Sequence, residues 1–188
     1  MFFKRSPLTF CDFVDNGFDP EEIKCLIKDV PNYPQDGIIF KDIAPLLLSP
    51  TTLQSVSKEL ASLSPSATLV AGIEARGFIF GSLVASTLGV GFVPLRKPGK
   101  LPRETFNVSY ELEYGKTELE MHTDALNQSD SVLIIDDVLA TGGTAHAAVQ
   151  LIEKAGGTVS GIGFVIEIKF LQGRDRLKNY PLKALITY

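Results

Sequence analysis

The sequence has few cysteines, no tryptophan, no excess of basic residues and no long hydrophobic run. Its two cysteines, Cys11 and Cys25, lie outside any C-x-x-C pattern, which disfavours a disulfide framework or a thiolate metal site and predicts free thiols in a reducing compartment. The net charge of -4 argues against a nucleic-acid-binding protein, which usually has a basic domain or face. The most apolar stretch, residues 77–93, contains four glycines and falls short of the ~20 apolar residues that a membrane span requires. No apolar signal-peptide region follows Lys4 and Arg5, so we expect a cytoplasmic protein that contacts neither nucleic acid nor membrane.

What the sequence does contain is enough apolar material for one globular domain. Hydrophobic residues make up 45% of the chain and charged residues 21%. A length of 188 residues is ordinary for one domain with a full core. No internal repeat, low-complexity tract or linker interrupts it, so we expect residues 1–188 to form a single domain.

Hydrophobic periodicity and turn signals predict an α/β fold. The order of strand, helix and strand that defines a βαβ unit occurs twice, at residues 68–73, 77–88 and 91–95 and at residues 132–137, 144–155 and 159–166. Two such units predict an open, mostly parallel twisted sheet flanked by helices on both faces.

The remaining segments add local elements to this sheet. Capping signals predict two further helices, at residues 20–29 and 51–63. Turn formers mixed with apolar residues predict a loop that presents side chains at residues 32–42. Two alternating segments, residues 108–114 and 117–121, predict an inserted β-hairpin.

The strongest functional signal is the run Val132-Leu-Ile-Ile-Asp-Asp-Val-Leu-Ala-Thr-Gly-Gly-Thr144. It places Asp136 and Asp137 at the carboxyl end of a buried strand, where ligands bind in open α/β sheets. The turn that opens the next helix consists of Ala140, Thr141, Gly142, Gly143 and Thr144. Its glycines permit a close backbone approach or positive φ, its threonines supply hydroxyl donors, and a helix N-terminus favours anions. The pattern predicts a phosphate-binding turn; it is not a Walker A loop, because no lysine follows the glycines.

A second signal is basic. Arg76 lies between a predicted strand end and a helix start, where a guanidinium and a helix N-terminus can hold an anion together. Arg96, Lys97 and Lys100 follow in an otherwise acidic chain. Such a cluster can also be a solvated loop. Beside a phosphate-binding turn it predicts a clamp for pyrophosphate, because fixed positive groups stabilise that leaving group.

Five segments resemble adenine phosphoribosyltransferases and occur in that family's order: residues 33–43, 74–78, 95–102, 110–116 and 136–144. The resemblance covers about residues 20–166. The last segment is shared by all type I phosphoribosyltransferases, whereas the segments at 95–102 and 110–116 are specific to the adenine enzymes. The resemblance implies the type I fold, with a small N-terminal hood of about residues 1–45 that helps to bind the base. It also implies a reaction, in purine salvage, that converts adenine and 5-phosphoribosyl-1-pyrophosphate to AMP and pyrophosphate.

The resemblance further implies a role for each candidate residue. Asp136 and Asp137 would lie at the ribose hydroxyls, and the phosphate-binding turn would hold the 5-phosphate. The pyrophosphate end would be bound by Arg76, Arg96, Lys97 and Lys100. The adenine pocket would be lined by Ile39, Phe40 and Lys41. The family usually has arginine at position 41; with lysine, a backbone contact there would be retained, whereas a side-chain contact need not be.

The hairpin would supply the chemistry. The resemblance implies that Glu113 is the acid/base residue at the purine imidazole, with Tyr114 beside it on a hairpin that closes over the site. From the residues alone, both also fit an ordinary exposed hairpin. The resemblance also implies a non-proline cis peptide bond at Glu74–Ala75 and a homodimer. The charge of the substrate predicts Mg²⁺, bound mainly through the substrate rather than by protein ligands.

Two alternatives remain open at this point. A phosphoribosyltransferase for another purine or a pyrimidine would keep the phosphate-binding turn but lack the hairpin segment at 110–116. A non-catalytic regulator that senses phosphoribosyl pyrophosphate would need a DNA-binding module, for which this acidic chain has neither the extra length nor a basic face.

Overall fold

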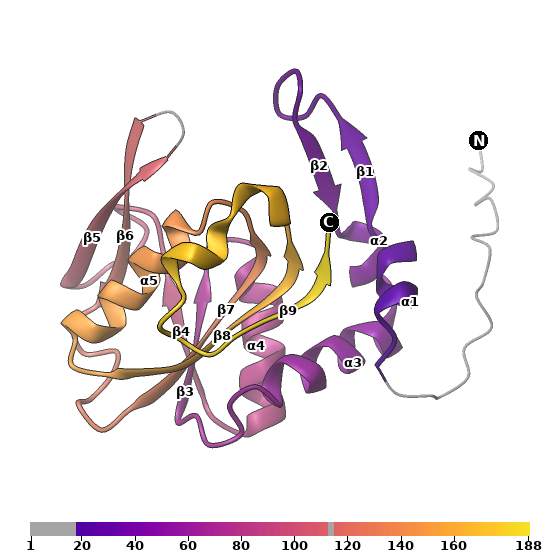
Figure 1. Ribbon diagram of the computed structural model, residues 1–188. Helices are drawn as coiled ribbons and strands as arrows, with labels where there is room; N and C mark the ends of the chain where they lie inside the picture. Colours follow the sequence, from indigo (N-terminus) through magenta and orange to yellow (C-terminus); the bar gives the residue numbers. More distant parts are fainter. Residues whose placement is uncertain (1–17, 113–114) are drawn as a thin grey trace, which may run out of the picture. The chain divides into compact units, whose positions relative to one another are not determined.

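The computed structural model describes residues 18–112 and 115–188, without the side chains of residues 111–116. The chain forms two compact units, one that ends at Ser49 and one that spans Pro50–Tyr188. Figure 1 shows the helices and strands of each. Among the described residues, no helix is both long and apolar enough to cross a membrane.

The first unit contains a short helix, a two-stranded antiparallel sheet and a helical turn: α1 (Pro20–Cys25), β1 (Lys28–Pro31), β2 (Ile39–Asp42) and α2 (Ala44–Leu47). The Asp19 side chain accepts a hydrogen bond from the amide of Glu21, so Asp19 is the N-cap of α1, as predicted. The helix predicted to reach residue 29 ends earlier, because the chain turns at Leu26 and enters β1. The prediction of a loop at 32–42 is wrong for its last four residues, which form β2.

The second unit carries the main sheet. Its elements are α3 (Pro50–Ala61), β3 (Leu69–Ile73), α4 (Gly77–Leu88), β4 (Gly91–Leu95), β5 (Thr105–Leu112), β6 (Gly115–His122), β7 (Ser131–Leu139), α5 (Gly143–Lys154), β8 (Thr158–Glu167), two 3-10 helices η1 (Lys169–Leu171) and η2 (Gly173–Arg176), and β9 (Leu182–Thr187). Five strands pair in the order β4-β3-β7-β8-β9, all in parallel. The predicted parallel sheet is confirmed; β9 and the 3-10 helices were not predicted.

Helices cover both faces of this sheet, as predicted. On β7, Leu133 and Ile135 point to one face, where Leu60 of α3 and Leu63, just after α3, join them around two glycines of β8, Gly161 and Gly163. Val132 and Ile134 alternate with them and join a buried cluster with the apolar side of α5. Figure 1 shows the sheet between α4 and α5. Apolar side chains therefore pack on both faces of the sheet, and β7 is buried on both sides.

The order of the strands determines where a ligand can bind. From β3 the chain crosses through α4 to β4, and from β7 it crosses through α5 to β8 on the opposite side. The connections thus diverge between the neighbouring strands β3 and β7. Ligands of open α/β sheets bind at the carboxyl ends of the strands beside such a switch point.

The predicted hairpin is confirmed as β5 and β6, which pair antiparallel from Thr105 with His122 to Leu112 with Gly115. Its predicted connection at residues 115–116 is wrong, because both residues belong to β6. Lys154 of α5 donates a 3.0 Å hydrogen bond to the carbonyl of Asn107. Arg96 and Glu120 form a backbone bridge that joins the end of β4 to β6. The base of the hairpin is therefore fixed both to the C-terminal end of α5 and to the end of β4.

Candidate functional site

The turn after β7 forms a small cavity at the switch point. It is lined by Asp136, Val138, Leu139, Phe164 and residues 140–145, and its volume is about 70 Å³. This is room for an anionic group of a few heavy atoms, not for a whole nucleotide. Five predicted site residues, Ala140 to Thr144, thus line one cavity together with Asp136.

Gly142 has the conformation that the sequence predicts for a phosphate-binding turn. Its φ is +78°, in the left-handed region, and it precedes the first residue of α5. A Cβ atom placed on Gly142 would lie 2.5 Å from the carbonyl oxygen of Gly173. Only glycine fits both the dihedral angle and the space at this position.

The loop that begins η2 packs against this turn and was not recognised from the sequence. A Cβ atom on Gly173 would lie 2.3 Å from the carbonyl oxygen of Ala140 and 3.0 Å from the amide nitrogen of Gly142. Arg174 then pairs with the buried carboxylate of Glu167, with 2.7 Å between Nε and Oε1. Glycine followed by charged residues is too common a pattern to reveal such a contact.

The adjacent aspartates lie in an electrostatically unfavourable position, Asp137 buried and Asp136 with part of its surface accessible in the cavity. Burial, and then the neighbouring carboxylate of Asp137, raise the pKa of Asp136 well above its usual value. Burial also raises the pKa of Asp137, although the guanidinium of Arg76 opposes this effect. The Nε atom of Arg76 lies 2.7 Å from Oδ2 of Asp137. The structure therefore joins two predicted site residues, one after β3 and one on β7, in an ion pair.

The basic residues after β4 are organised by an acidic partner. The guanidinium of Arg96 pairs with the carboxylate of Glu74, with Nε and Nη2 each 3.2 Å from a carboxylate oxygen. Lys97 and Lys100 are exposed on the same short loop. The Glu74–Ala75 peptide bond is cis, which confirms the geometric prediction.

The three residues predicted to bind the base lie on β2, in the first unit. The ring of Phe40 contacts that of Tyr33 edge-on, with 5.2 Å between the ring centres. Lys41 lies opposite Asp29 in the β1–β2 pairing, and its Nζ is 2.6 Å from a carboxylate oxygen of Asp29. The lysine side chain is thus engaged within its own unit. Glu113 and Tyr114, the predicted catalytic residues, lie outside the described residues.

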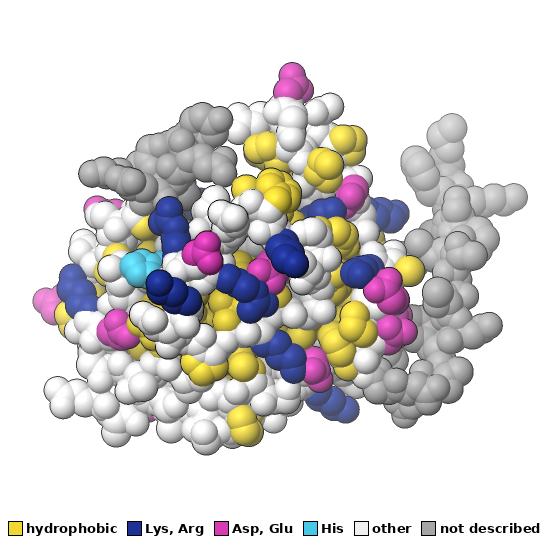
Figure 2. All heavy atoms as spheres, in the orientation of Figure 1, with side chains coloured by type: hydrophobic (Ala, Val, Ile, Leu, Met, Phe, Trp, Pro, Cys, Tyr) yellow, Lys and Arg dark blue, Asp and Glu magenta, His cyan; other side chains and the backbone are white. Residues whose placement is uncertain are grey.

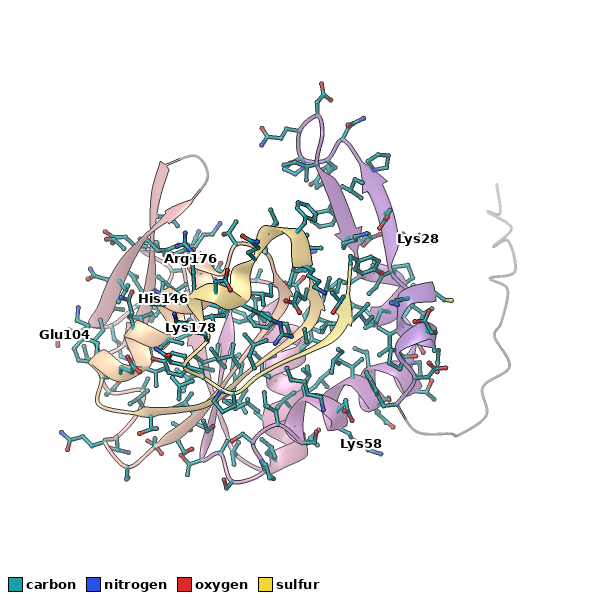
Figure 3. All side chains as sticks on the ribbon, viewed as in Figure 1. Lys28, Lys58, Glu104, His146, Arg176 and Lys178 are labelled. Atoms are coloured by element: carbon teal, nitrogen blue, oxygen red, sulfur yellow. The ribbon has the colours of Figure 1, made fainter. Side chains whose placement is uncertain are left out.

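The surface around α5 has mixed charge. On the face that Figure 2 shows, acidic and basic side chains are interspersed, without a continuous basic stripe among the side chains that are coloured. Figure 3 labels His146 of α5 and, from η2 and the residues after it, Arg176 and Lys178. This mixture of charges on the face shown agrees with the net charge of -4.

Comparison with known proteins identifies the family of this arrangement. Residues 52–184 match the phosphoribosyl transferase domain. An adenine phosphoribosyltransferase of Nitrosococcus oceani is 53% identical over 170 residues, which cover 89% of this chain and 99% of that protein. The chain belongs to the adenine phosphoribosyltransferase family. Two solved structures of the family agree: the enzyme of Thermoanaerobacter pseudethanolicus has a TM-score of 0.87 at 47% identity, covering 90% of this chain and 100% of that one, and that of Saccharomyces cerevisiae a TM-score of 0.83 at 40% identity, covering 88% and 97%.

Membership of the adenine phosphoribosyltransferases explains why the sheet has this topology. The match at 52–184 contains the phosphate-binding turn, both aspartates, Arg76 and the basic loop. It also contains Gly173 and the carboxylate of Glu74, for which the sequence alone predicts no role in the site. A signal for Glu74 was present, because it lies in one of the five segments that resemble the family, but its pairing with Arg96 required the structure.

Proposed function

We infer that this protein is a purine salvage enzyme that transfers the phosphoribosyl group of 5-phosphoribosyl-1-pyrophosphate to adenine, giving AMP and pyrophosphate. The observation that carries this conclusion is the phosphate-binding turn beside paired aspartates at the switch point of the sheet, in a chain of the adenine phosphoribosyltransferase family. The structure from Saccharomyces cerevisiae is a complex with adenine and an imino-altritol bisphosphate, so that relative binds the base and a phosphorylated sugar analogue.

In this reaction the turn at residues 140–144 binds the 5-phosphate. The carboxylates of Asp136 and Asp137 accept hydrogen bonds from the ribose hydroxyls. Because burial raises the pKa of both groups, hydroxyl donors that favour the ionised form relieve an existing electrostatic cost. Arg76, Lys97 and Lys100 supply positive charge for pyrophosphate, which stabilises it as it leaves.

Adenine specificity resides in the first unit. Phe40 offers a ring for stacking, and the backbone of Ile39 to Lys41 can read the hydrogen-bonding edge of the base. The ion pair between Lys41 and Asp29 favours a backbone contact at this position over a side-chain contact. The replacement of the family's usual arginine by lysine then leaves adenine recognition intact.

An assay of AMP formation tests the function directly. Purified protein with phosphoribosyl pyrophosphate should convert adenine to AMP, with hypoxanthine and guanine as competing bases. Turnover with adenine at least about a hundredfold above the other two is expected, because a base that mismatches a hydrogen-bonding pocket leaves buried polar groups unpaired. Preferential turnover of another base would identify a different phosphoribosyltransferase.

We also propose that Mg²⁺ enters with the substrate. In the described part of the chain, no group of three or more His, Cys, Asp or Glu side chains is placed to hold a metal ion. Asp136 and Asp137 are only two carboxylates, and one of them already pairs with Arg76. This donor set fits Mg²⁺, which commonly keeps several waters and binds through one or two carboxylates plus substrate phosphates. When bound, the ion would neutralise charge on the pyrophosphate.

Chelation should therefore inactivate the enzyme. We expect excess EDTA to lower AMP formation by at least about tenfold, because the substrate's charge is then only partly offset. Adding Mg²⁺ beyond the EDTA should restore the rate, and EDTA already saturated with Mg²⁺ is the control. Undiminished turnover in excess EDTA would rule out the proposal.

The contact between Gly173 and the phosphate-binding turn predicts a selective binding defect. Gly173→Ala should raise the KM for phosphoribosyl pyrophosphate by about tenfold, because the new methyl group displaces the carbonyl of Ala140 or the amide of Gly142. The KM for adenine should change little. Gly91→Ala is the control: its methyl would lie 2.9 Å from the end of the flexible Leu69 side chain, at the opposite end of the strands. Equal effects of the two changes would show that crowding alone, and not the turn, is responsible.

We further propose a cytoplasmic homodimer, on the resemblance to the family alone. Light scattering during gel filtration of the full chain should give twice the 20.4 kDa mass of one chain. A monomer at the concentrations used for the assay would contradict this proposal.

A further inference from the structure

The basic loop at residues 96–100 is held by acidic side chains. The amide of Lys97 donates a 3.0 Å hydrogen bond to Oε2 of Glu74, and the amide of Gly99 donates one of 3.2 Å to Oε2 of Glu120. The backbone of Arg96 is bonded in both directions to that of Glu120, at 2.9 and 2.7 Å. Two carboxylates, of Glu74 and Glu120, and one backbone bridge thus hold the loop in place.

Arg96 ties the same loop together through its side chain. Its Nε and Nη2 atoms donate to the two carboxylate oxygens of Glu74, and Nη1 donates to the carbonyl of Lys100 at 3.0 Å. The guanidinium also lies 5.9 Å from the ring centre of Phe78. All three guanidinium nitrogens are therefore used inside the protein, and the carbonyl of Lys100 is bound to the residue at the other end of the loop.

A carboxylate at this position is unexpected for a site that binds a polyanion, because it adds repulsion. Glu74 nevertheless stays ionised. Partial burial alone would raise its pKa, but hydrogen bonds from Arg96 and the Lys97 amide, and the charges of Arg96 and Lys100, lower it below the usual value. Its charge is thus compensated by Arg96, which leaves the exposed Lys97 and Lys100 as the groups that face solvent from this loop.

The position of Glu74 in the fold connects this loop to the switch point. Glu74 directly follows β3, and its amide donates a 2.9 Å hydrogen bond to the carbonyl of Leu95 at the end of β4. Two residues later, Arg76 pairs with Asp137 of β7. The short segment after β3 therefore contacts the basic loop through Glu74 and Asp137 through Arg76.

We propose that Glu74 is a positioning residue that acts through Arg96 and the Lys97 amide to hold the loop at 96–100 in the shape that binds the pyrophosphate end of the substrate. The proposal rests on the proposed function, since that function supplies the pyrophosphate. Glu74 thus promotes the binding of pyrophosphate, although it is itself acidic and does not contact the anion. Glu120, through the Gly99 amide, supports the same loop at its other end.

The substitution Glu74→Gln tests this role. Glutamine keeps the size and one acceptor but cannot pair with the guanidinium at both oxygens while also accepting from Lys97. The KM for phosphoribosyl pyrophosphate, and that for pyrophosphate in the reverse reaction, should rise about tenfold or more, as expected for loss of a charge-assisted bidentate pair. The KM for adenine should stay within about twofold.

Glu59→Gln is the matched control. Glu59 pairs with Lys183, and both of these side chains are about one-third exposed, similar to Arg96 in its pair with Glu74. The pair joins α3 to β9 and includes none of the predicted site residues. The control should therefore lower the melting temperature to a similar extent without changing any KM.

A double-mutant cycle shows whether Glu74 acts through Arg96. Arg96→Gln combined with Glu74→Gln should raise the KM no further than the more damaging single change, because both break the same link. Fully additive effects, or an unchanged KM for both phosphorylated substrates in Glu74→Gln, would overturn the proposal.

If Glu74→Gln does not fold, Glu120→Gln replaces it. A smaller rise in the KM for phosphoribosyl pyrophosphate is then expected, and an unchanged KM would again overturn the proposal. Absence of AMP formation by the wild-type protein in the same assay would instead refute the proposed function.

Discussion

Replacing Gly142 by valine should abolish detectable binding of phosphoribosyl pyrophosphate. The residue has a φ of +78°, which a β-branched side chain adopts only with strain of about 1–2 kcal/mol or more. The added Cβ would also lie 2.5 Å from the carbonyl oxygen of Gly173, which is backbone and cannot rotate away. Relief of this overlap requires the turn at 140–144 to move, and with it the amides that we propose to hold the 5-phosphate. We expect affinity to fall by at least about a hundredfold, measured by calorimetry.

Gly89→Val separates this effect from simple backbone strain. Gly89 ends α4 with a φ of +71°, and a Cβ there would meet no atom within 4 Å. The control has the same dihedral penalty without the steric overlap, so it should lower the melting temperature but preserve substrate affinity. The Gly142 variant should also be less stable than wild type, because the loop at Gly173 is displaced. Normal affinity in the Gly142 variant would mean that the phosphate binds elsewhere.

The parts of the fold that could be predicted from the sequence are those with a strong local signal. Gly77–Leu88 and Gly91–Leu95 have the predicted bounds, because an apolar helix and a short buried strand are each delimited by glycine. The phosphate-binding turn was also evident, since its glycines, threonines and preceding aspartates are consecutive. Local chemistry and local conformation coincide in this segment.

The parts that could not be predicted depend on pairing between distant segments. β2 has no period-two alternation and is a strand only because it pairs with β1. β9 similarly depends on pairing with β8. The ion pair between Arg76 and Asp137 follows from the register of β3 and β7, in which Gly72 lies opposite Ile135, so that the segment after β3 meets Asp137 of β7. The roles of Glu74 and Gly173 arise from the same kind of long-range contact.

The second large effect is expected at Glu113, which the resemblance to the family implies to be the acid/base residue. Formation of AMP requires proton movement at the imidazole ring of adenine, and a positioned carboxyl group typically contributes roughly 10²–10⁴-fold to such a step. The hairpin that carries Glu113 is fixed at its base, through the bridge of Arg96 to Glu120, beside the basic loop. We expect Glu113 to approach bound substrate while the hairpin stays attached to the core at its base.

Glu113→Gln should lower kcat by a factor within that range and leave the dissociation constant of phosphoribosyl pyrophosphate almost unchanged. Glutamine keeps the size and one hydrogen-bond acceptor but cannot transfer the proton. Glu118→Gln, the same substitution on the same hairpin, is the control: Glu118 accepts a 3.0 Å hydrogen bond from Ser109, away from the turn, and its loss should change kcat by less than about threefold. The measurement should be made under single-turnover conditions, because product release cannot then mask the chemical step. Near-normal turnover of the Glu113 variant would assign the proton transfer to water or to another group, and would leave Glu113 only a part of the closing hairpin.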